Sequence, residues 1–228
     1  MSTDYRWLFN VMRGMGLAEV LRTLAVALAV VVGIRAFLFA PYWIPSGSMV
    51  PALLPGDLLI VSKFTYGHPF RRGNVVVFVS PTGSGEVLVK RIIGLPGDTV
   101  QMQGGRLFIN GKAVPCADEG HYEDESGAGP VVARRCAEAL PGGKVYPILK
   151  VTDQGFANNT PVYTVPPGDL FLLGDNRDNS EDSRFLGGTV GYVPEVDVIG
   201  PAVLVLGSVD PHAPGVGVRL GRFFHRVN

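Results

Sequence analysis

The sequence predicts a mainly β protein with a single N-terminal transmembrane helix, and three observations support this. The 30 glycines and 18 prolines among 228 residues supply the many turns that short strands need. One long apolar run precedes residue 41, and the chain beyond it breaks into short apolar runs without a competing helical period. These short runs, which we predict to be strands, lie at 58–62, 75–79, 87–94, 107–110, 146–151, 170–174 and 198–206.

The first element is the apolar run at 20–40, VLRTLAVALAVVVGIRAFLFA. As a helix it would be about 31 Å long, against a hydrocarbon thickness of roughly 30 Å, so it can just cross a bilayer. Arg35 lies near its end, where a long side chain can reach the interface. A cleaved signal peptide is the alternative, because the uninterrupted apolar part spans only about 12 residues. The bulky residues after Arg35 are unlike a cleavage site, and we therefore expect an uncleaved anchor.

The orientation of this anchor follows from its flanking charges. Arg6, Arg13 and Arg22 lie before or at the start of the apolar run, and basic residues beside a span favour the cytoplasmic side. We therefore expect a cytoplasmic N-terminal segment at 1–19, with everything after Pro41 on the other side of the membrane. The cysteines would then lie in an oxidising compartment.

Glycine-containing turns separate the predicted strands. Pro-Gly-Asp occurs at 55–57, 96–98 and 167–169, where Pro can set the first corner and Gly can adopt a positive φ. Asn110 and Gly111 predict a hairpin, because both residues tolerate the left-handed backbone that a two-residue turn needs.

Beyond the anchor, composition divides the chain into segments. We predict that 41–100 and 160–207 form one β domain, with an insertion subdomain at 101–159 and a basic tail at 208–228. The acidic, Gly- and Ala-rich part at 116–138 indicates a solvated segment without visible chemistry. The tail could contact anionic lipid through its arginines and phenylalanines, although a frayed tail is the favoured interpretation.

The composition also limits cofactors and partners. Cys116 and Cys136 are the only cysteines, and they could form one disulfide or stay two free thiols. Neither they nor His121 with its neighbouring carboxylates match a metal-ligand spacing. Lys plus Arg and Asp plus Glu both number 20, so no basic excess argues for nucleic acid as a partner.

Two serines, Ser46 and Ser48, lie in the proline-rich loop PYWIPSGSMVP that follows the apolar run. A serine hydroxyl needs a base within hydrogen-bond reach to act as a nucleophile. No histidine lies in a motif with a carboxylate, although a Ser-His-Asp triad assembled from distant positions stays open. Lys90 is the other candidate, because the apolar residues around it could desolvate its amine and lower its pKa. Periodicity alone favours a different interpretation, in which Lys90 and Arg91 alternate along a strand and one of them faces solvent.

A polar cluster, LGDNRDNSEDSR, follows the predicted strand at 170–174. Four of its residues have the ligand spacing of an EF-hand calcium loop: Asn176, Asp178, Ser180 and Asp182. Glu181 and Gly187, however, occupy positions where that template needs Gly and Glu. A polar loop that satisfies itself through Arg-Asp pairs explains the cluster without a metal.

Taken together, PSGSM after the apolar run, KRIIGLPGD and GDNRDNSEDSR resemble bacterial type I signal peptidase, the leader peptidase of the inner membrane. The resemblance implies a single-pass protein of the bacterial inner membrane, whose extracytoplasmic domain consists of coiled antiparallel β-sheets. It also implies a membrane-anchored serine endopeptidase that removes N-terminal signal peptides from exported preproteins, cleaving after small residues in an Ala-x-Ala pattern.

The resemblance further implies a role for each matched residue. Ser48 would be the nucleophile and Lys90 the general base of a Ser-Lys dyad. The Ser46 hydroxyl and the Ser48 backbone N–H would form the oxyanion hole.

Other matched residues would support this dyad or bind substrate. Ser180 would hydrogen-bond the Lys90 amine, Asp182 and Arg184 would hold that loop as a salt bridge, and Asp175 and Arg177 would share in this scaffold. Tyr42, Ile44 and Val89 match positions that line the pockets for small side chains. No metal or organic cofactor is implied, and the expected partners are signal peptides and membrane lipid.

Two alternatives stay open. One is a related Ser-Lys processing peptidase of a conjugative transfer system, which would have a narrower substrate range. The other is a membrane-tethered, calcium-binding interaction protein that uses the acidic loop.

Overall fold

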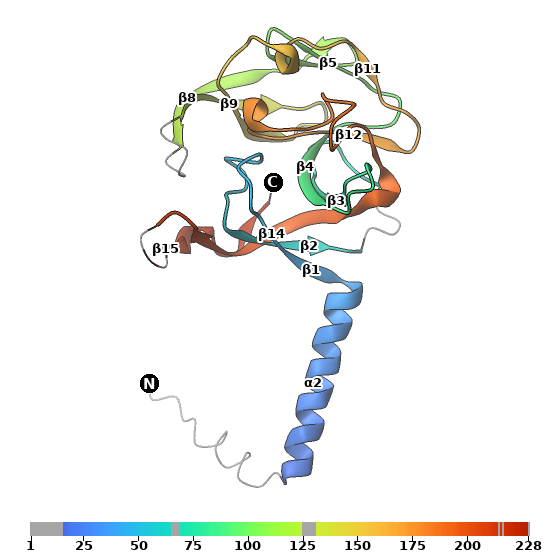
Figure 1. The fold of residues 1–228 in the computed structure, drawn as a ribbon, viewed down its shortest axis with the longest axis vertical. Coiled ribbons are helices and arrows are strands. Elements are labelled where there is room, and N and C mark those ends of the chain that lie inside the picture. Colours follow the sequence, from blue (N-terminus) through green and yellow to red (C-terminus); the bar gives the residue numbers. More distant parts are fainter. Residues whose placement is uncertain (1–15, 65–68, 125–130, 214, 216, 228) are drawn as a thin grey trace. The chain divides into compact units, whose positions relative to one another are not determined.

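The computed structural model describes residues 16–64, 69–124, 131–213, 215 and 217–227. The chain divides into two compact units, Met1–Phe39 and Ala40–Asn228. The first unit contains helix α2, and the second contains the β-strands (Figure 1).

Helix α2 (Leu17–Phe37) overlaps the apolar run at 20–40, so a helix forms where one was predicted. Within the described ranges, no helix is long and apolar enough to cross a membrane, and the predicted transmembrane anchor is therefore not confirmed. Arg6, Arg13 and the side chain of Arg35 lie outside the described residues.

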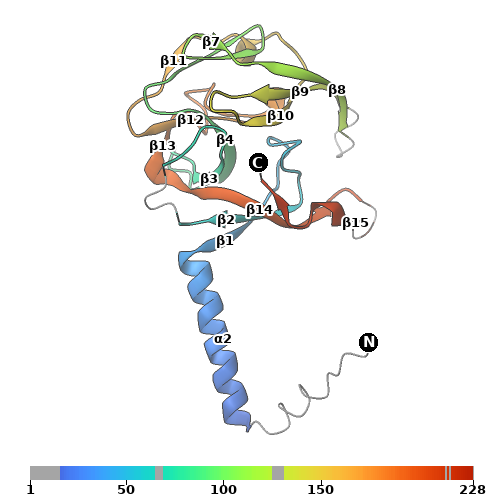
Figure 2. The ribbon, with the colours of Figure 1, turned by 180° about the vertical axis from the view of Figure 1, so that it is seen from behind.

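The second unit contains three sheets, of which the largest has nine strands (Figures 1 and 2). The strand order is β1-β2-β14-β3-β4-β12-β13, with β15 and β16 paired to β14. Its strands are β1 (Phe39–Trp43), β2 (Asp57–Ser62), β3 (Val75–Val79), β4 (Val87–Gly94), β12 (Asp169–Leu173), β13 (Val193–Pro194), β14 (Val198–Asp210), β15 (Gly217–Val218) and β16 (His225–Arg226). The long β14 pairs antiparallel with both β2 and β3, and register shifts in both pairings bend it. The expected coiled, antiparallel β architecture is therefore present.

Two smaller sheets, in the orders β10-β9-β8 and β11-β5-β6-β7, lie together on one side of β14 in both views (Figures 1 and 2). Their strands are β5 (Thr99–Gln103), β6 (Arg106–Ile109), β7 (Lys112–Ala113), β8 (Cys116–Asp124), β9 (Val131–Ala139), β10 (Val145–Lys150) and β11 (Tyr163–Thr164). Short 3₁₀ helices occur at η1 (Phe156–Asn158), η2 (Arg177–Asn179), η3 (Glu195–Asp197) and η4 (Leu220–Arg222). All seven predicted strands are present, whereas the other strands, among them the polar β8 and β9, were not predicted.

The predicted turns have the backbone that their residues favour. Gly56, Gly97 and Gly168 of the three Pro-Gly-Asp turns have φ of 89°, 85° and 81°. Gly56 is also required sterically, because a Cβ there would lie 1.9 Å from a backbone oxygen of β14. Asn110 and Gly111 have φ of 52° and 73° and connect β6 to β7, which confirms the predicted hairpin.

Residues 101–159, the predicted insertion, share a hydrophobic core with the predicted β domain. One cluster of buried residues combines Met102, Leu107 and Tyr146 of the insertion with Ile93 of β4 and Phe171 of β12. The large apolar side chains of β5, β6 and β10 therefore pack against β4, which carries Lys90, and against β12, which precedes the polar cluster.

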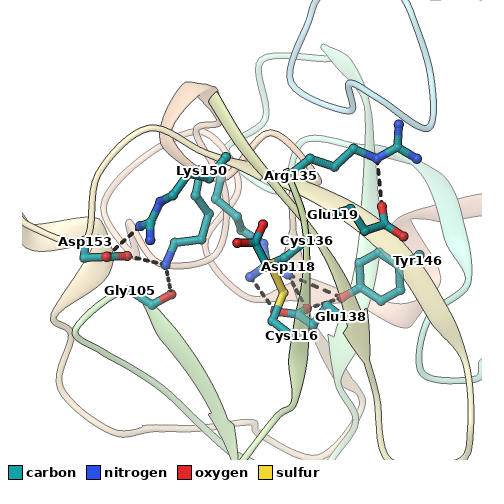
Figure 3. Close-up of a disulfide and its surroundings, with 12 residues drawn as sticks. Gly105, Cys116, Asp118, Glu119, Arg135, Cys136, Glu138, Tyr146, Lys150 and Asp153 are labelled. Carbon is teal, nitrogen blue, oxygen red and sulfur yellow. Dashed lines mark hydrogen bonds and ion pairs between the residues drawn. A yellow bond between two sulfur atoms is a disulfide. The ribbon is translucent and has the colours of Figure 1, made fainter. Parts of the chain in front are cut away.

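The segment at 116–138 is largely exposed, as its composition indicated, but it has regular structure. Its described residues form the β8–β9 hairpin, which a disulfide between Cys116 and Cys136 crosslinks with a Cα–Cα distance of 5.5 Å (Figure 3). The sequence left open whether the two cysteines form a disulfide or stay free thiols, and in the structure they form the disulfide. Glu138, at the end of this segment, is buried.

The basic tail also differs from the favoured expectation of a frayed end. Strands β15 and β16 pair with β14. Arg222 forms an ion pair with the fully buried Asp57, at 2.8 Å between Nε and Oδ1, and donates to the backbone oxygen of Ala52. A buried carboxylate needs a partner, and the tail supplies it.

Candidate active site

Ser48 and Lys90 lie in hydrogen-bond contact although 42 residues separate them in sequence. The distance from Lys90 Nζ to Ser48 Oγ is 2.7 Å. Lys90 lies in the middle of β4, where it pairs with Val76 of β3 in the antiparallel register. Lys90 is 4% exposed and Arg91 is fully buried, so the interpretation in which one of them faces solvent is wrong.

The same contact distinguishes between the two kinds of base considered for Ser48, a histidine and Lys90. Three of the four histidines, His121, His212 and His225, are exposed, and His68 lies outside the described residues. Among the described residues, the basic side chain that contacts the Ser48 hydroxyl is Lys90.

The environment of Lys90 favours its neutral form. Burial is the main influence, and it lowers the pKa of the amine below the ordinary value of 10.5. The negative charges of Asp182 and Asp175 act in the opposite direction without reversing the shift. A larger fraction of the amine is therefore deprotonated near neutral pH than in a solvated lysine, as a general base requires.

The loop that carries Ser48 is anchored on both sides of the serine. Met49, Val50 and Leu53 are buried in apolar clusters. Asn176 donates from its backbone N to the Ser48 oxygen at 3.1 Å, and from Nδ2 to the Gly47 oxygen at 3.1 Å. The loop is therefore held by the polar cluster after β12 as well as by its own apolar residues.

Ser46 lies close to the dyad. Its Oγ is 3.4 Å from Ser48 Oγ, and the residue is exposed. The Ser46 hydroxyl thus lies beside Ser48, and its role as a donor in an oxyanion hole stays a prediction.

The chain matches a known protein family over most of its length. The family profile described as "Signal peptidase, peptidase S26" matches residues 17–206. The chain belongs to the signal peptidase family, peptidase S26.

Curated relatives of the S26 family extend the match. Signal peptidase I of Rickettsia typhi (strain ATCC VR-144 / Wilmington) is 32% identical over 210 residues, which cover 80% of this chain and 76% of the relative. Signal peptidase I of Rickettsia akari (strain Hartford) is 33% identical over 199 residues, covering 75% and 73%. A crystal structure of a signal peptidase I from Enterococcus faecalis V583 is 27% identical, covers 58% of this chain and 96% of that chain, and gives a TM-score of 0.33.

In this S26 chain, the expected salt bridge of the polar cluster is present. Arg184 binds Asp182 through Nε at 2.7 Å and Nη2 at 2.8 Å, and both side chains are fully buried. Asp182 also accepts from the backbone N of Gly174 at 3.1 Å. The pair therefore holds both ends of the cluster together.

Asp175 and Arg177 pair with residues outside the cluster, which the sequence did not indicate. Asp175 accepts two hydrogen bonds from Arg91, at 2.8 Å and 2.7 Å. Arg177 forms a buried ion pair with Glu138 of β9. Arg91 directly follows Lys90 in sequence, and this position could have identified Arg91 as a residue near the site. Nothing in the acidic segment distinguished Glu138 from its neighbours.

Ser180 lies in the expected place but lacks the expected contact. Among the described residues, its buried Oγ has no hydrogen-bond partner, so the predicted bond to Lys90 is not found. A Cβ on Gly174 would lie 2.2 Å from Ser180 Oγ and 2.6 Å from the Ser48 backbone oxygen. Gly174 is thus a site residue that we did not predict, because it lets the two serine segments approach each other.

The residues predicted to bind substrate, Tyr42, Ile44 and Val89, come together in one apolar cluster with Met49. Ile44 is buried, and Tyr42 and Val89 are half-buried beside it. The cluster adjoins Ser48 and Lys90 in sequence on both segments, and the binding role of its members stays a prediction.

The carboxylates proposed for calcium are engaged elsewhere. Asp178 accepts from the backbone N of Val151 at 2.7 Å and of Thr152 at 3.1 Å, and from Asn158. Asp182 binds Arg184. In the part of the chain that the structure describes, no group of three His, Cys, Asp or Glu side chains is arranged to hold a metal ion.

Proposed function

We propose that this protein is a serine endopeptidase that removes N-terminal signal peptides from exported preproteins, with Ser48 as nucleophile and Lys90 as general base. The 2.7 Å contact between the buried Lys90 amine and the Ser48 hydroxyl carries the proposal. Membership of the S26 family and the names of the relatives support the substrate class.

The reaction follows from the protonation state of Lys90. The neutral amine accepts the Ser48 proton as Oγ attacks the scissile carbonyl carbon. The Ser46 hydroxyl and the Ser48 backbone N–H donate to the oxyanion of the tetrahedral intermediate. The Lys90 ammonium then protonates the leaving amine, and the regenerated amine activates a water that hydrolyses the acyl-enzyme.

An open strand edge beside Lys90 supports substrate binding in an extended form. Strand β4 pairs with β3 along 87–91, whereas its pairing with β12 begins at Arg91. The free edge of 87–90 can accept a peptide strand, and Tyr42, Ile44 and Val89 would then contact its side chains. Shallow apolar contacts of this kind suit the small residues of an Ala-x-Ala site.

We propose that helix α2 attaches the enzyme to the bacterial plasma membrane, with 1–19 cytoplasmic and the β unit on the extracytoplasmic side. The leucines of α2 and all its valines except Val20 are exposed, which supports contact with lipid. The Cys116–Cys136 disulfide supports an oxidising compartment. Carbonate extraction and protease protection of membrane vesicles test this; release by carbonate would contradict it.

In this assignment, 41–100 and 160–207 form the catalytic domain, and 101–159 is an insertion that packs on it. Segment 208–228 supports the Ser48 loop through Arg222.

Cleavage of a preprotein with an Ala-x-Ala site tests the proposal. Ser48→Ala removes the nucleophile and is expected to lower kcat at least about 10³-fold. Ser84→Ala, at an exposed serine of a distant turn, is the matched control and should leave the rate unchanged. Near wild-type cleavage by Ser48→Ala would contradict the assignment.

Two further measurements test the alternatives. A panel of preproteins would reveal the narrower substrate range of a conjugative-transfer peptidase, and a calcium titration would test the binding-protein alternative.

A further inference from the structure

Glu138 is a buried carboxylate in the β8–β9 hairpin, far in sequence from the proposed dyad. It is 2% exposed. Its Oε1 accepts from Arg177 Nη1 at 2.9 Å, and its Oε2 accepts from Arg177 Nη2 and from Tyr146 Oη. Burial raises the pKa of Tyr146, so the phenol stays protonated and donates to the carboxylate.

Arg177 transmits this contact to the loop beside Ser48. Its Nε donates to the Gly174 oxygen at 3.2 Å, and its own backbone oxygen accepts from Arg184 Nη2. Gly174 lies against the Ser48 backbone and Ser180. Without Glu138, the buried Arg177 would keep its charge but lose its counter-ion, which is costly, so the loop would rearrange.

Both cysteines of the disulfide lie next to Glu138 in the hairpin. Cys116 lies opposite Glu138 in the β8–β9 register. Cys136 precedes Glu138 by two residues, and therefore on the same side of β9. Figure 3 shows Cys116 beside Glu138, with Tyr146 hydrogen-bonded to the carboxylate. The bridge thus fixes β8 to β9 at the point where the buried carboxylate projects.

We propose that Glu138 is a positioning residue for the Ser48–Lys90 site, acting through Arg177, and that the Cys116–Cys136 disulfide holds it in place. Reduction of the disulfide therefore lowers turnover. This inference rests on the proposed function for its kinetic readout.

Reduction needs an external dithiol. The dithiol supplies two electrons and two protons, the S–S bond breaks, Cys116 and Cys136 become thiols, and the dithiol becomes a disulfide. Cys116 is exposed and Cys136 half-buried, so a thiolate can reach the bridge. The oxidised form is then the fully active one.

Steady-state kinetics on the full chain test the role of Glu138. Glu138→Ala is expected to lower kcat about 10- to 100-fold, because small displacements of catalytic groups have effects of this size, while KM changes little. Glu138→Gln, which keeps an acceptor for Tyr146 without the charge for Arg177, should give an intermediate kcat. Glu119→Gln is the matched control, since Glu119 lies on the same hairpin but forms an exposed pair with Arg135. An unchanged kcat in Glu138→Ala, or a loss seen only in KM, would overturn the proposal.

Reduction with dithiothreitol tests the disulfide without any substitution. The reduced wild type should lose about tenfold in kcat, and Cys116→Ser with Cys136→Ser should show the same loss and no further response. In Glu138→Ala, reduction should cause no further loss of kcat, because both changes disrupt the same connection between the hairpin and Arg177. If reduction and Glu138→Ala instead lowered kcat additively, the disulfide would act on the site by a route that does not include Glu138, and the proposal would be overturned.

Hydrogen exchange supplies a readout that does not depend on cleavage. Both reduction and Glu138→Ala should increase amide exchange at 174–184, whereas Glu119→Gln should not. If the wild type cleaves no preprotein, the proposed function fails, and this exchange still tests the connection. Unchanged exchange at 174–184 in reduced protein would overturn the connection even if cleavage is confirmed.

Discussion

Two neighbouring cations of β4 are both buried, yet their surroundings differ. Arg91 binds Asp175 through two hydrogen bonds and lies over the Tyr146 ring at 3.9 Å. Lys90, one residue earlier, contacts the neutral Ser48 hydroxyl, and among the described residues it forms no ion pair. A paired guanidinium keeps its charge and supports the fold, whereas an unpaired buried amine tends to lose its proton. One strand thus presents a structural cation on one face and the proposed base on the other.

The largest effect is expected from exchanging the type of cation at position 90. Lys90→Arg keeps a positive charge, but a guanidinium does not deprotonate and cannot accept the Ser48 proton. We expect at least about a 10³-fold loss of kcat on an Ala-x-Ala preprotein, a loss of the size seen when such residues are removed. Lys112→Arg, at an exposed lysine of β7, is the control. Substantial activity in Lys90→Arg would show that another group is the base.

Removing the paired cation should affect stability. Arg91→Met leaves Asp175 buried without its partner, and breaking such a pair costs about 3–5 kcal/mol in the free energy of unfolding. Urea denaturation measures this change. Arg72→Met, which breaks the less deeply buried pair with Asp98, whose side chains are 13% and 12% exposed, should cost less. Equal losses in the two variants would contradict the difference in burial.

The rate should depend on pH through Lys90. Because the base must be neutral, kcat/KM should rise with pH to a plateau, with an apparent pKa below the ordinary 10.5. Wild type and Ser46→Ala should share this midpoint, although Ser46→Ala loses about 10²-fold in rate as an oxyanion donor. A flat profile would count against Lys90 as the base.

The smallest effect is a gain in stability. The pKa of Lys90 is lower in the folded state than in the unfolded chain, so the unfolded chain binds more protons and the lysine destabilises the fold at low and neutral pH. This cost fades as the pH rises from the lowered pKa towards 10.5. Lys90→Met should therefore unfold at a higher temperature than the wild type at pH 7, with a smaller difference at pH 10. A lower melting temperature at pH 7 would contradict this.

The sequence predicted what depends on local pattern. The apolar runs gave the strands, including β3 and β4 at their observed bounds, and the glycine turns gave their connections. The Ser48 and Lys90 segments could be matched because each has a distinctive motif, and the structure brings them into contact.

What escaped prediction depends on pairing between distant residues. Glu138 looks like any acidic residue of a polar segment, and only the fold reveals that it meets Arg177 in the core. The strands β8 and β9 escaped because cross-strand pairing and a disulfide, more than apolar alternation, form them. The role of Gly174 depends on the approach of two loops, which local sequence does not encode.

The ion pair of Arg222 with Asp57 has a consequence for the order in which the enzyme matures. Arg222 also donates to the Ala52 oxygen, within the loop that carries Ser48, and it is 165 residues beyond Asp57. During synthesis, Ser48, the proposed nucleophile, is made early, but the contact of Arg222 with the Ser48 loop forms only after the distant arginine has been made. A growing chain therefore contains Ser48 long before the loop around Ser48 can be completed. Peptidase activity is expected to appear only late in synthesis.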